Sequence, residues 1–149
     1  MSKYESLKIG VQFQTHVVSP TAFRELVGDA LDLGVDSVFL WDHLVPFTGI
    51  EGQVSWDTWT LLGSFAEVFR GREKVLGVLV SPLSIREPAM LARSAATIAL
   101  LGNGTFVLGV GSGGYVHDDI LTDAPKDSAS RMNLFCRRLT FLRDEVQRI

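Results

Sequence analysis

The feature that most constrains this sequence is an apolar run that turns directly into glycines, Thr105–Gly114, which reads TFVLGVGSGG. Its stretch from Phe106 to Val110 contains no polar residue, which is typical of a strand buried on both faces in a helix-covered parallel sheet. Glycines after such a strand let the backbone adopt positive φ and bring amide groups close to a ligand. We therefore predict an anion site, suited to a phosphate group, at Gly111–Gly114.

The same glycines match the spacing of the dinucleotide fingerprint, with Gly109, Gly111 and Gly114 at its three positions. That motif belongs on a first strand and opens a helix at once, whereas a polar loop over residues 115–127 follows here. The context disfavours a Rossmann fold. A plain tight turn and a phosphate or cofactor turn in a barrel both remain open at this point.

Short β-prone segments alternate along the chain with segments whose apolar residues recur at helical spacing. The predicted strands are residues 9–13, 35–41, 74–80 and 106–110. The predicted helices are bounded by Ser19 and Gly34, by Asp57 or Thr58 and Gly71, and by Pro88 and Gly102, with a last one beginning at Ser128 or Ser130. This alternation predicts one α/β domain, residues 1–149, as a doubly wound sheet or part of a (βα)8 barrel.

In both architectures the chemistry gathers at the carboxyl ends of the strands. Asp42 and His43 follow the second predicted strand, and Ser81 follows the third. Histidine titrates near neutrality, so His43 suits proton transfer to a substrate oxygen or a cofactor nitrogen, with Asp42 as a second acid or base. The alternative is that Asp42 caps the next turn and His43 packs in the core. The residues alone leave both interpretations open.

Charge and hydropathy limit the kinds of partner to expect. The formal net charge of −3 gives no sign of a nucleic-acid surface or an anionic membrane partner. Gly, Pro or charged residues interrupt each apolar stretch before the roughly 18 residues that a membrane span needs. The N-terminus is polar and charged through Lys8, unlike a signal peptide. We therefore expect a cytoplasmic protein.

Three histidines and one cysteine complete the set of chemically reactive candidates. The histidines lack metal-ligand spacing such as H-x-x-x-H, so we expect no metal site. His16 and His117 lie in polar loops, where we expect solvated side chains. Cys136 lies beside the inward-facing Phe135 of the last helix, so we expect it to be partly buried, and as the only cysteine it forms no internal disulfide.

Five segments together resemble the bacterial-luciferase-like superfamily of flavin- and deazaflavin-dependent oxidoreductases. They are Phe39–Leu44 (FLWDHL), Asp57–Leu62 (DTWTLL), Gly77–Pro82 (GVLVSP), Arg86–Ala92 leading into Ala95–Ile98, and Phe106–Gly113 (FVLGVGSG). All five occur in the order expected for the family, and the resemblance extends in weaker form to the first strand and the last helix. It implies a TIM-barrel fold with a flavin-type ring at the carboxyl ends of the strands.

The resemblance also implies a cofactor and an activity. The cofactor is coenzyme F420, with FMN as the alternative. The reaction is hydride transfer or, with reduced flavin and O₂, monooxygenation of a small organic substrate. In members that use F420 the Asp-His pair approaches the deazaflavin ring, which places Asp42 and His43 at the reaction centre.

The cofactor-binding residues are implied in the same way. A cis peptide bond that backs the ring maps to Val78-Leu79, with Ser81 following at the end of the same strand. The cofactor phosphate maps to Ser112, Gly113 and Gly114, which agrees with the anion site inferred from the glycines.

Two features differ from the family pattern. F420-using members often carry an acidic residue where this chain has Gly114. Family chains close eight βα units and this sequence contains four, which implies the N-terminal half of a (βα)8 barrel. Uncovered strand edges favour association, so we expect a homodimer, with a partner supplying the second half or a truncated chain as alternatives. The alternative function is a non-catalytic flavin-binding or accessory subunit.

Overall fold

The computed structural model describes residues 7–16, 18–47, 53–102 and 104–149 and contains one four-stranded parallel sheet. The strands are β1 (Gly10–Phe13), β2 (Ser37–Leu40), β3 (Val75–Pro82) and β4 (Thr105–Gly111). Their order in the sheet is β1-β2-β3-β4, so each strand pairs with its neighbour in sequence. This order is that of a (βα)8 barrel, because a doubly wound sheet reverses direction at a switch point. Residues 1–6, on which the expected lack of a signal peptide depends, lie outside the described residues.

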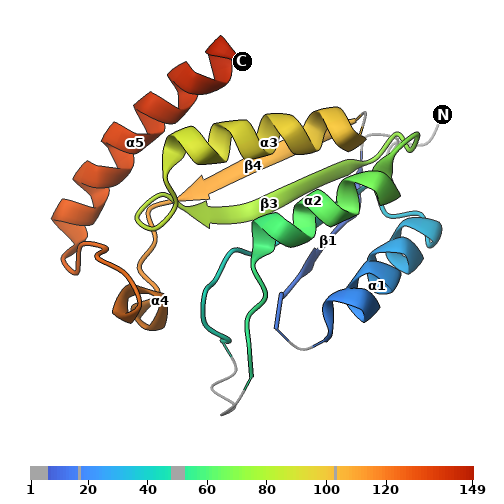
Figure 1. The fold of residues 1–149 in the computed structure, drawn as a ribbon, viewed down its shortest axis with the longest axis horizontal. Helices are drawn as coiled ribbons and strands as arrows, with labels where there is room; N and C mark the ends of the chain where they lie inside the picture. Colours follow the sequence, from blue (N-terminus) through green and yellow to red (C-terminus); the bar gives the residue numbers. More distant parts are fainter. Residues whose placement is uncertain (1–6, 17, 48–52, 103) are drawn as a thin grey trace.

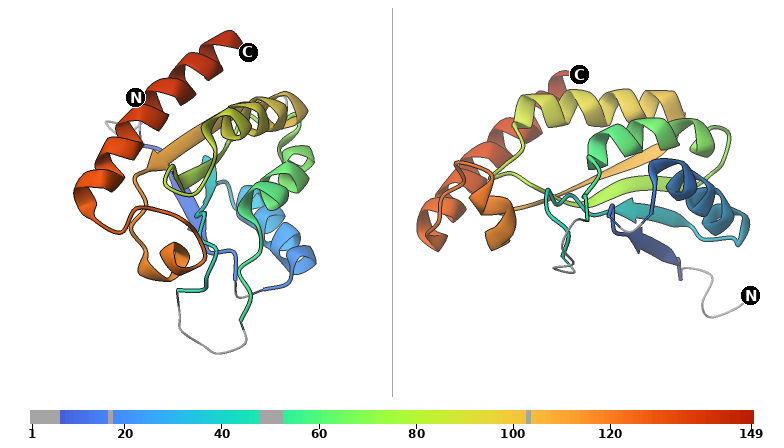
Figure 2. Two further views of the ribbon diagram at one scale, coloured as in Figure 1. Left: turned by 60° about the vertical axis from the view of Figure 1, so that its left-hand side comes forward. Right: turned by 60° about the horizontal axis from the view of Figure 1, so that its bottom comes forward.

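Helices follow the strands and cover one face of the sheet (Figure 1). They are α1 (Pro20–Asp32), α2 (Thr58–Phe69), α3 (Pro88–Gly102), α4 (Val116–Ile120) and α5 (Ser128–Arg148). Figure 2 shows α1, α2 and α3 on the same side of the sheet, with α4 beyond the ends of the strands. The short helix α4 lies within the predicted polar loop 115–127 and was not predicted.

The helix boundaries follow from their capping residues. Ser19 and Asp57 cap α1 and α2, and each side chain accepts a hydrogen bond from the backbone N–H three residues further on. Gly34 and Gly71 follow these helices with φ of +94° and +76°, as predicted for glycines after a helix. For α5 the cap is Asp127, rather than either of the two predicted serines.

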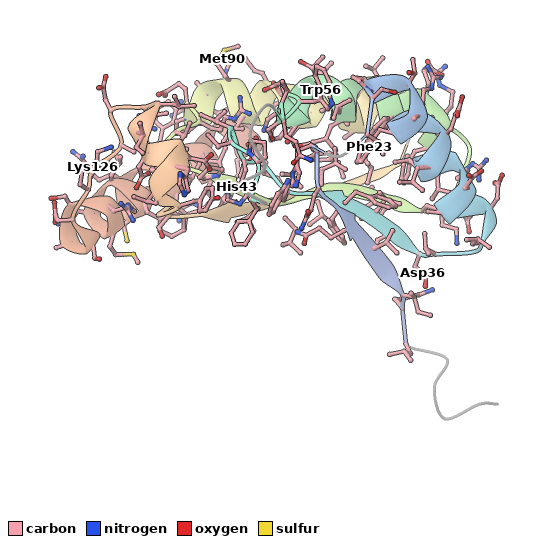
Figure 3. The ribbon with its side chains drawn as sticks, turned by 90° about the horizontal axis from the view of Figure 1, so that it is seen from below. Phe23, Asp36, His43, Trp56, Met90 and Lys126 are labelled. Carbon is pink, nitrogen blue, oxygen red and sulfur yellow. The ribbon has the colours of Figure 1, made fainter. Side chains whose placement is uncertain are left out.

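The hydrophobic core lies between the sheet and the helices. Val38, Leu40 and Val78 are fully buried and face the helical layer, where they meet residues such as Phe23, labelled in Figure 3. The other face of the sheet has no covering element in the described ranges of the chain, and Val107 of β4 is 39% exposed. The prediction that residues 106–110 are buried on both faces was therefore wrong, because only the helical side is covered.

Three side chains of α3 and α5 are exposed, and for Cys136 this contradicts the expectation that it is partly buried. Leu101 is 42% exposed, because Gly102 takes the inward position at the end of α3 and packs against α2. In α5, Leu142 is buried but Val146 is half exposed. Cys136 is exposed, since α5 packs against α3 along only one narrow face.

Candidate functional site

A cavity of about 320 Å³ lies at the carboxyl ends of β2, β3 and β4. Its lining includes Asp42, His43, Val80, the glycine turn at residues 111–114, and Asp118. The structure therefore brings together the Asp-His pair and the glycine turn, which are distant in the sequence. Figure 3 shows His43 at this end of the sheet, beside α4.

The glycine turn has the backbone conformation expected for an anion-binding loop. Gly113 and Gly114 have φ of +80° and +125°, which is strained for any residue with a side chain. A Cβ at Gly113 would overlap the buried hydroxyl of Ser84. Successive residues in such conformations expose backbone N–H groups to an anion. With Gly111 and Ser112 in the cavity wall, the turn fits a phosphate group.

An arginine that was not predicted lies against this turn. A Cβ at Gly114 would stand 2.6 Å from Nη1 of Arg131, which belongs to the first turn of α5. Arg131 Nη2 donates to Asp119 Oδ2 at 2.8 Å, and Nε donates to the carbonyl of Pro125 at 3.1 Å. Nη1 has no hydrogen-bond acceptor among the described residues, so its N–H groups remain free beside the turn. No motif in the sequence marks this contact, because it joins a loop to a helix.

His43 is held by a second acid that was not predicted. Its Nδ1 lies 2.7 Å from Oδ2 of Asp118, whose side chain is almost fully buried. Oδ1 of Asp118 accepts the backbone N–H groups of Leu44 and Val45 at 2.9 and 3.0 Å. His43 is about a quarter exposed, and its Nε2 has no partner within the described part of the chain. A histidine held this way can exchange a proton through Nε2.

Asp42 has a different environment from His43. Its carboxylate is 2% exposed and accepts hydrogen bonds from Ser81 Oγ at 2.6 Å and from Arg86 Nη2 at 2.6 Å. Trp59 Nε1 and Arg86 Nε donate to the same carboxylate at 3.2 and 3.0 Å. Burial opposes the charge of the guanidinium, but Asp42 and Asp57 outweigh it and raise the pKa of Arg86 above its ordinary value. This network fixes the floor of the cavity.

The third strand differs from the prediction in the position of its cis peptide bond. The cis peptide bond is Leu79-Val80, one residue later than predicted. Val78 is fully buried in the core on the helical side, whereas Leu79 and Val80 are 46% and 39% exposed on the open face. Strict alternation of side chains fails here, since two consecutive residues share one face. Ser81 is fully buried and reaches the site only through Asp42.

His16 was predicted to be solvated, but it is only 3% exposed. The hydrogen bond from Trp56 N to Thr15 O, at 2.8 Å, brings the β2–α2 loop over the end of β1 and explains this burial. The His16 ring lies 5.3 Å from that of Trp41, and the Trp41 ring lies 4.5 Å from that of His43. Burial, and then the nearby His43, lower the pKa of His16.

Metal binding and membrane insertion can be judged for the described residues. These residues contain no group of three or more His, Cys, Asp or Glu side chains arranged to hold a metal ion. None of the helices described is long and apolar enough to cross a bilayer.

Known structures share this fold. An F420-dependent secondary alcohol dehydrogenase, solved with an F420-acetone adduct, superimposes with a TM-score of 0.78 at 21% identity, over 91% of this chain and 41% of that one. The FMN complex of a type II Baeyer-Villiger monooxygenase from Pseudomonas putida gives a TM-score of 0.71 at 16% identity, over 91% and 38% of the two chains. The four βα units therefore correspond to about half of a (βα)8 barrel.

Curated sequences place the chain more closely. It is 33% identical over 108 residues to an F420-dependent glucose-6-phosphate dehydrogenase of Amycolatopsis mediterranei, covering 72% of this chain and 32% of that protein. It is 34% identical over 106 residues to a phthiodiolone/phenolphthiodiolone dimycocerosates ketoreductase of Mycobacterium tuberculosis, covering 60% and 28%. The chain thus spans about a third of the length of these relatives. A model of the luciferase-like monooxygenase family matches residues 7–133, and the chain belongs to this family.

Proposed function

We propose that this chain binds coenzyme F420, with FMN as the alternative, and takes part in hydride transfer to or from a small organic substrate. The observation that carries this proposal is the cavity in which the His43–Asp118 pair faces the glycine turn. F420 is preferred because a curated relative that is 33% identical over 72% of this chain is F420-dependent.

The residues present fit such a cofactor. Its phosphate would lie on the N–H groups of Ser112–Gly114, with Arg131 Nη1 supplying positive charge beside them. The exposed side chains of Leu79 and Val80 offer an apolar surface for the ring. The turn therefore suits the phosphate of the cofactor, and Val80 in the cavity wall suits its ring.

The chemical roles follow from the contacts. The bound cofactor supplies hydride transfer, which leaves the protein to move a proton. Asp118 orients His43, whose free Nε2 takes the proton from a substrate alcohol or returns it to a carbonyl oxygen. Asp42 accepts hydrogen bonds from Ser81 and Arg86, and we assign it the role of a positioning residue in the cavity wall.

The open face of the sheet implies a further association. β1 and β4 are both edge strands in the described sheet, and exposed edges pair readily. We propose that a second copy of the chain covers this face, with a separate polypeptide as the alternative. Solution mass from light scattering tests this directly, and a monomer at high concentration would contradict self-association.

The test of cofactor binding is a calorimetric titration of the folded chain with F420 and with FMN. Gly113→Ala should weaken binding about tenfold or more, because the new Cβ overlaps Ser84 and the φ of +80° disfavours it. Gly28→Ala is the matched control, since a Cβ there meets nothing within 4 Å. Lack of binding by the folded wild-type chain would overturn the proposal for this chain.

A further inference from the structure

The two edges of the sheet are complementary to each other in shape and charge. We propose that two copies of this chain join edge to edge, with β4 of each copy pairing in parallel with β1 of the other, and close an eight-stranded barrel with two-fold symmetry. This inference rests on the self-association proposed above and specifies which surfaces make the contact.

The first observation is an apolar groove of about 230 Å³ beside β4. It is lined by Phe106 and Leu108 of β4, by four alanines of α3, and by Val146 and Ile149 at the end of α5. Phe106 and Leu108 face the helical layer, so the groove adjoins the position that a fifth strand would occupy. Apolar side chains on the helical face of such a strand would fill it.

The strand that suits this edge is β1 of a second copy. Val11 and Phe13 face the helical layer at alternate positions, and Ile9 precedes them at the same spacing and is 62% exposed. Parallel pairing adds main-chain hydrogen bonds along both strands. Because β1 and β4 are the two outer strands of the described sheet, one contact used twice covers both edges. A different partner would need two unlike contacts to do the same.

The second observation is opposite charge on the helices next to the two edges. They lie at opposite ends of the helical layer (Figure 1). α5 contains five arginines and two acidic residues, a net charge of +3, and α1 contains one arginine and three acidic residues, a net charge of −2. Arg143 and Arg148 of α5 are exposed on either side of Val146 in the groove wall. Glu25 and Asp29 of α1 are exposed and have no ion-pair partner among the described residues. Head-to-tail pairing brings these charges together, whereas pairing of two like edges would oppose them.

The third observation is that the open face of the sheet resembles the interior of a closed barrel. Phe39 of β2 lies over glycines of both neighbouring strands, since a Cβ at Gly77 would stand 2.7 Å from its ring and one at Gly10 would stand 3.5 Å from it. Small barrels fill their interiors with large and small side chains in alternation. Closure would also bury Val107, which is exposed on this face.

Closure has a consequence for the cavity. Adjacent parallel strands end at the same side of a sheet, so the carboxyl end of β1 in one copy would lie beside the glycine turn that follows β4 in the other. The cavity, which this turn lines, is then bounded by both copies. Cofactor binding should therefore strengthen dimerisation, and dimerisation should strengthen cofactor binding.

The experiment follows solution mass and amide hydrogen exchange of the full chain over a wide range of concentration. The mass should rise to that of two chains, each of 16.4 kDa, and not beyond it. Exchange should slow in β1 and β4 together as the dimer forms, with α2, which packs between α1 and α3, as the internal reference. A monomer at every concentration, a larger assembly, or a dimer in which either edge exchanges as before would overturn the proposal.

Charge-reversal variants test the pairing of the two helices independently. Glu25→Arg/Asp29→Arg and Arg143→Glu/Arg148→Glu should each dimerise at least about tenfold more weakly at low salt, because like charges then meet at both junctions. An equal mixture should recover dimerisation, since one junction of the mixed dimer keeps two native helices and the other pairs two reversed helices. Unchanged dimerisation of either variant, or no recovery in the mixture, would refute the head-to-tail contact.

Glu67→Arg/Glu73→Arg is the matched control. It makes the same change of charge at exposed positions on α2 and on the loop after it, away from both edges, and should leave dimerisation unchanged. Circular dichroism of each variant checks that it is folded.

Cofactor titrations on the same samples separate this inference from the proposed cofactor. If the dimer forms with both edges protected and neither F420 nor FMN binds, the cofactor assignment fails and the edge pairing stands. If a cofactor binds to a chain that stays monomeric, the edge pairing fails and the cofactor assignment stands.

Discussion

Nδ1 of His43 lies 2.7 Å from Oδ2 of Asp118, a residue 75 positions further along the chain. The contact fixes which ring nitrogen carries the proton, because a carboxylate accepts only from a protonated Nδ1. Nε2 is thereby left as the atom that exchanges protons with a substrate. Loss of this contact should affect proton transfer more than cofactor binding.

Asp118→Asn should lower turnover about a hundredfold in the assembled enzyme, because an amide no longer holds His43 in one tautomer. Cofactor affinity should change little, since Asp118 is not one of the proposed phosphate ligands. The measurements are steady-state kinetics across pH and the ¹⁵N signals of the His43 ring. Asp123→Asn, at an exposed position of the same loop, is the control. Normal turnover with an altered His43 tautomer would show that the His43–Asp118 pair is not needed for the reaction.

Arg131→Gln should weaken FMN about tenfold and leave riboflavin almost unaffected, because only FMN carries a phosphate. Isothermal titration with the two ligands gives the ratio directly. Arg137→Gln, on an exposed position of α5, should leave both affinities unchanged. Equal weakening of both ligands by Arg131→Gln would indicate a general loss of structure and contradict the phosphate assignment.

Stability should fall as the pH drops, through His16. Its folded-state pKa lies below the ordinary value, so the unfolded chain binds a proton more readily and stability is lost as pH falls below about 6.5. Urea unfolding at several pH values between 5 and 8 measures this slope. His16→Phe should flatten this slope, because the variant removes the group whose pKa differs between the folded and unfolded chain. An identical slope in wild type and variant would show that His16 makes no contribution.

Arg86→Met should destabilise the fold by about 3 kcal/mol, because it leaves the buried Asp42 carboxylate without its main counter-charge. Denaturant unfolding measures the free energy. The double variant Asp42→Asn/Arg86→Met should recover part of this loss, since it removes the isolated charge. Additive losses in the double variant would show that the two residues are not energetically coupled.

Local sequence rules predicted the elements well. Ser19, Asp57 and Gly71 act within a turn of their own helix, so their roles are readable from neighbouring residues. The glycine turn was equally readable, since positive φ at Gly113 and Gly114 is a local property. The family resemblance added the pairing of this turn with His43.

Contacts between loops were not predictable in this way. Asp118 and Arg131 act on His43 and Gly114 from segments with no regular spacing, so no motif in the sequence marks them. Burial of His16 depends on the β2–α2 loop crossing the end of β1, which is a tertiary contact. The cis bond was assigned one residue early, because alternation along β3 breaks at that bond.

The three bonds of Asp118 have a consequence for engineering. They fasten the loop after β2 to the loop after β4, although β3 lies between these strands in the sheet. An exchange of the β2 loop alone with that of a relative would replace Leu44 and Val45, whose backbone N–H groups donate to Asp118. Grafts of new specificity into this scaffold should therefore transplant the two loops as one cassette.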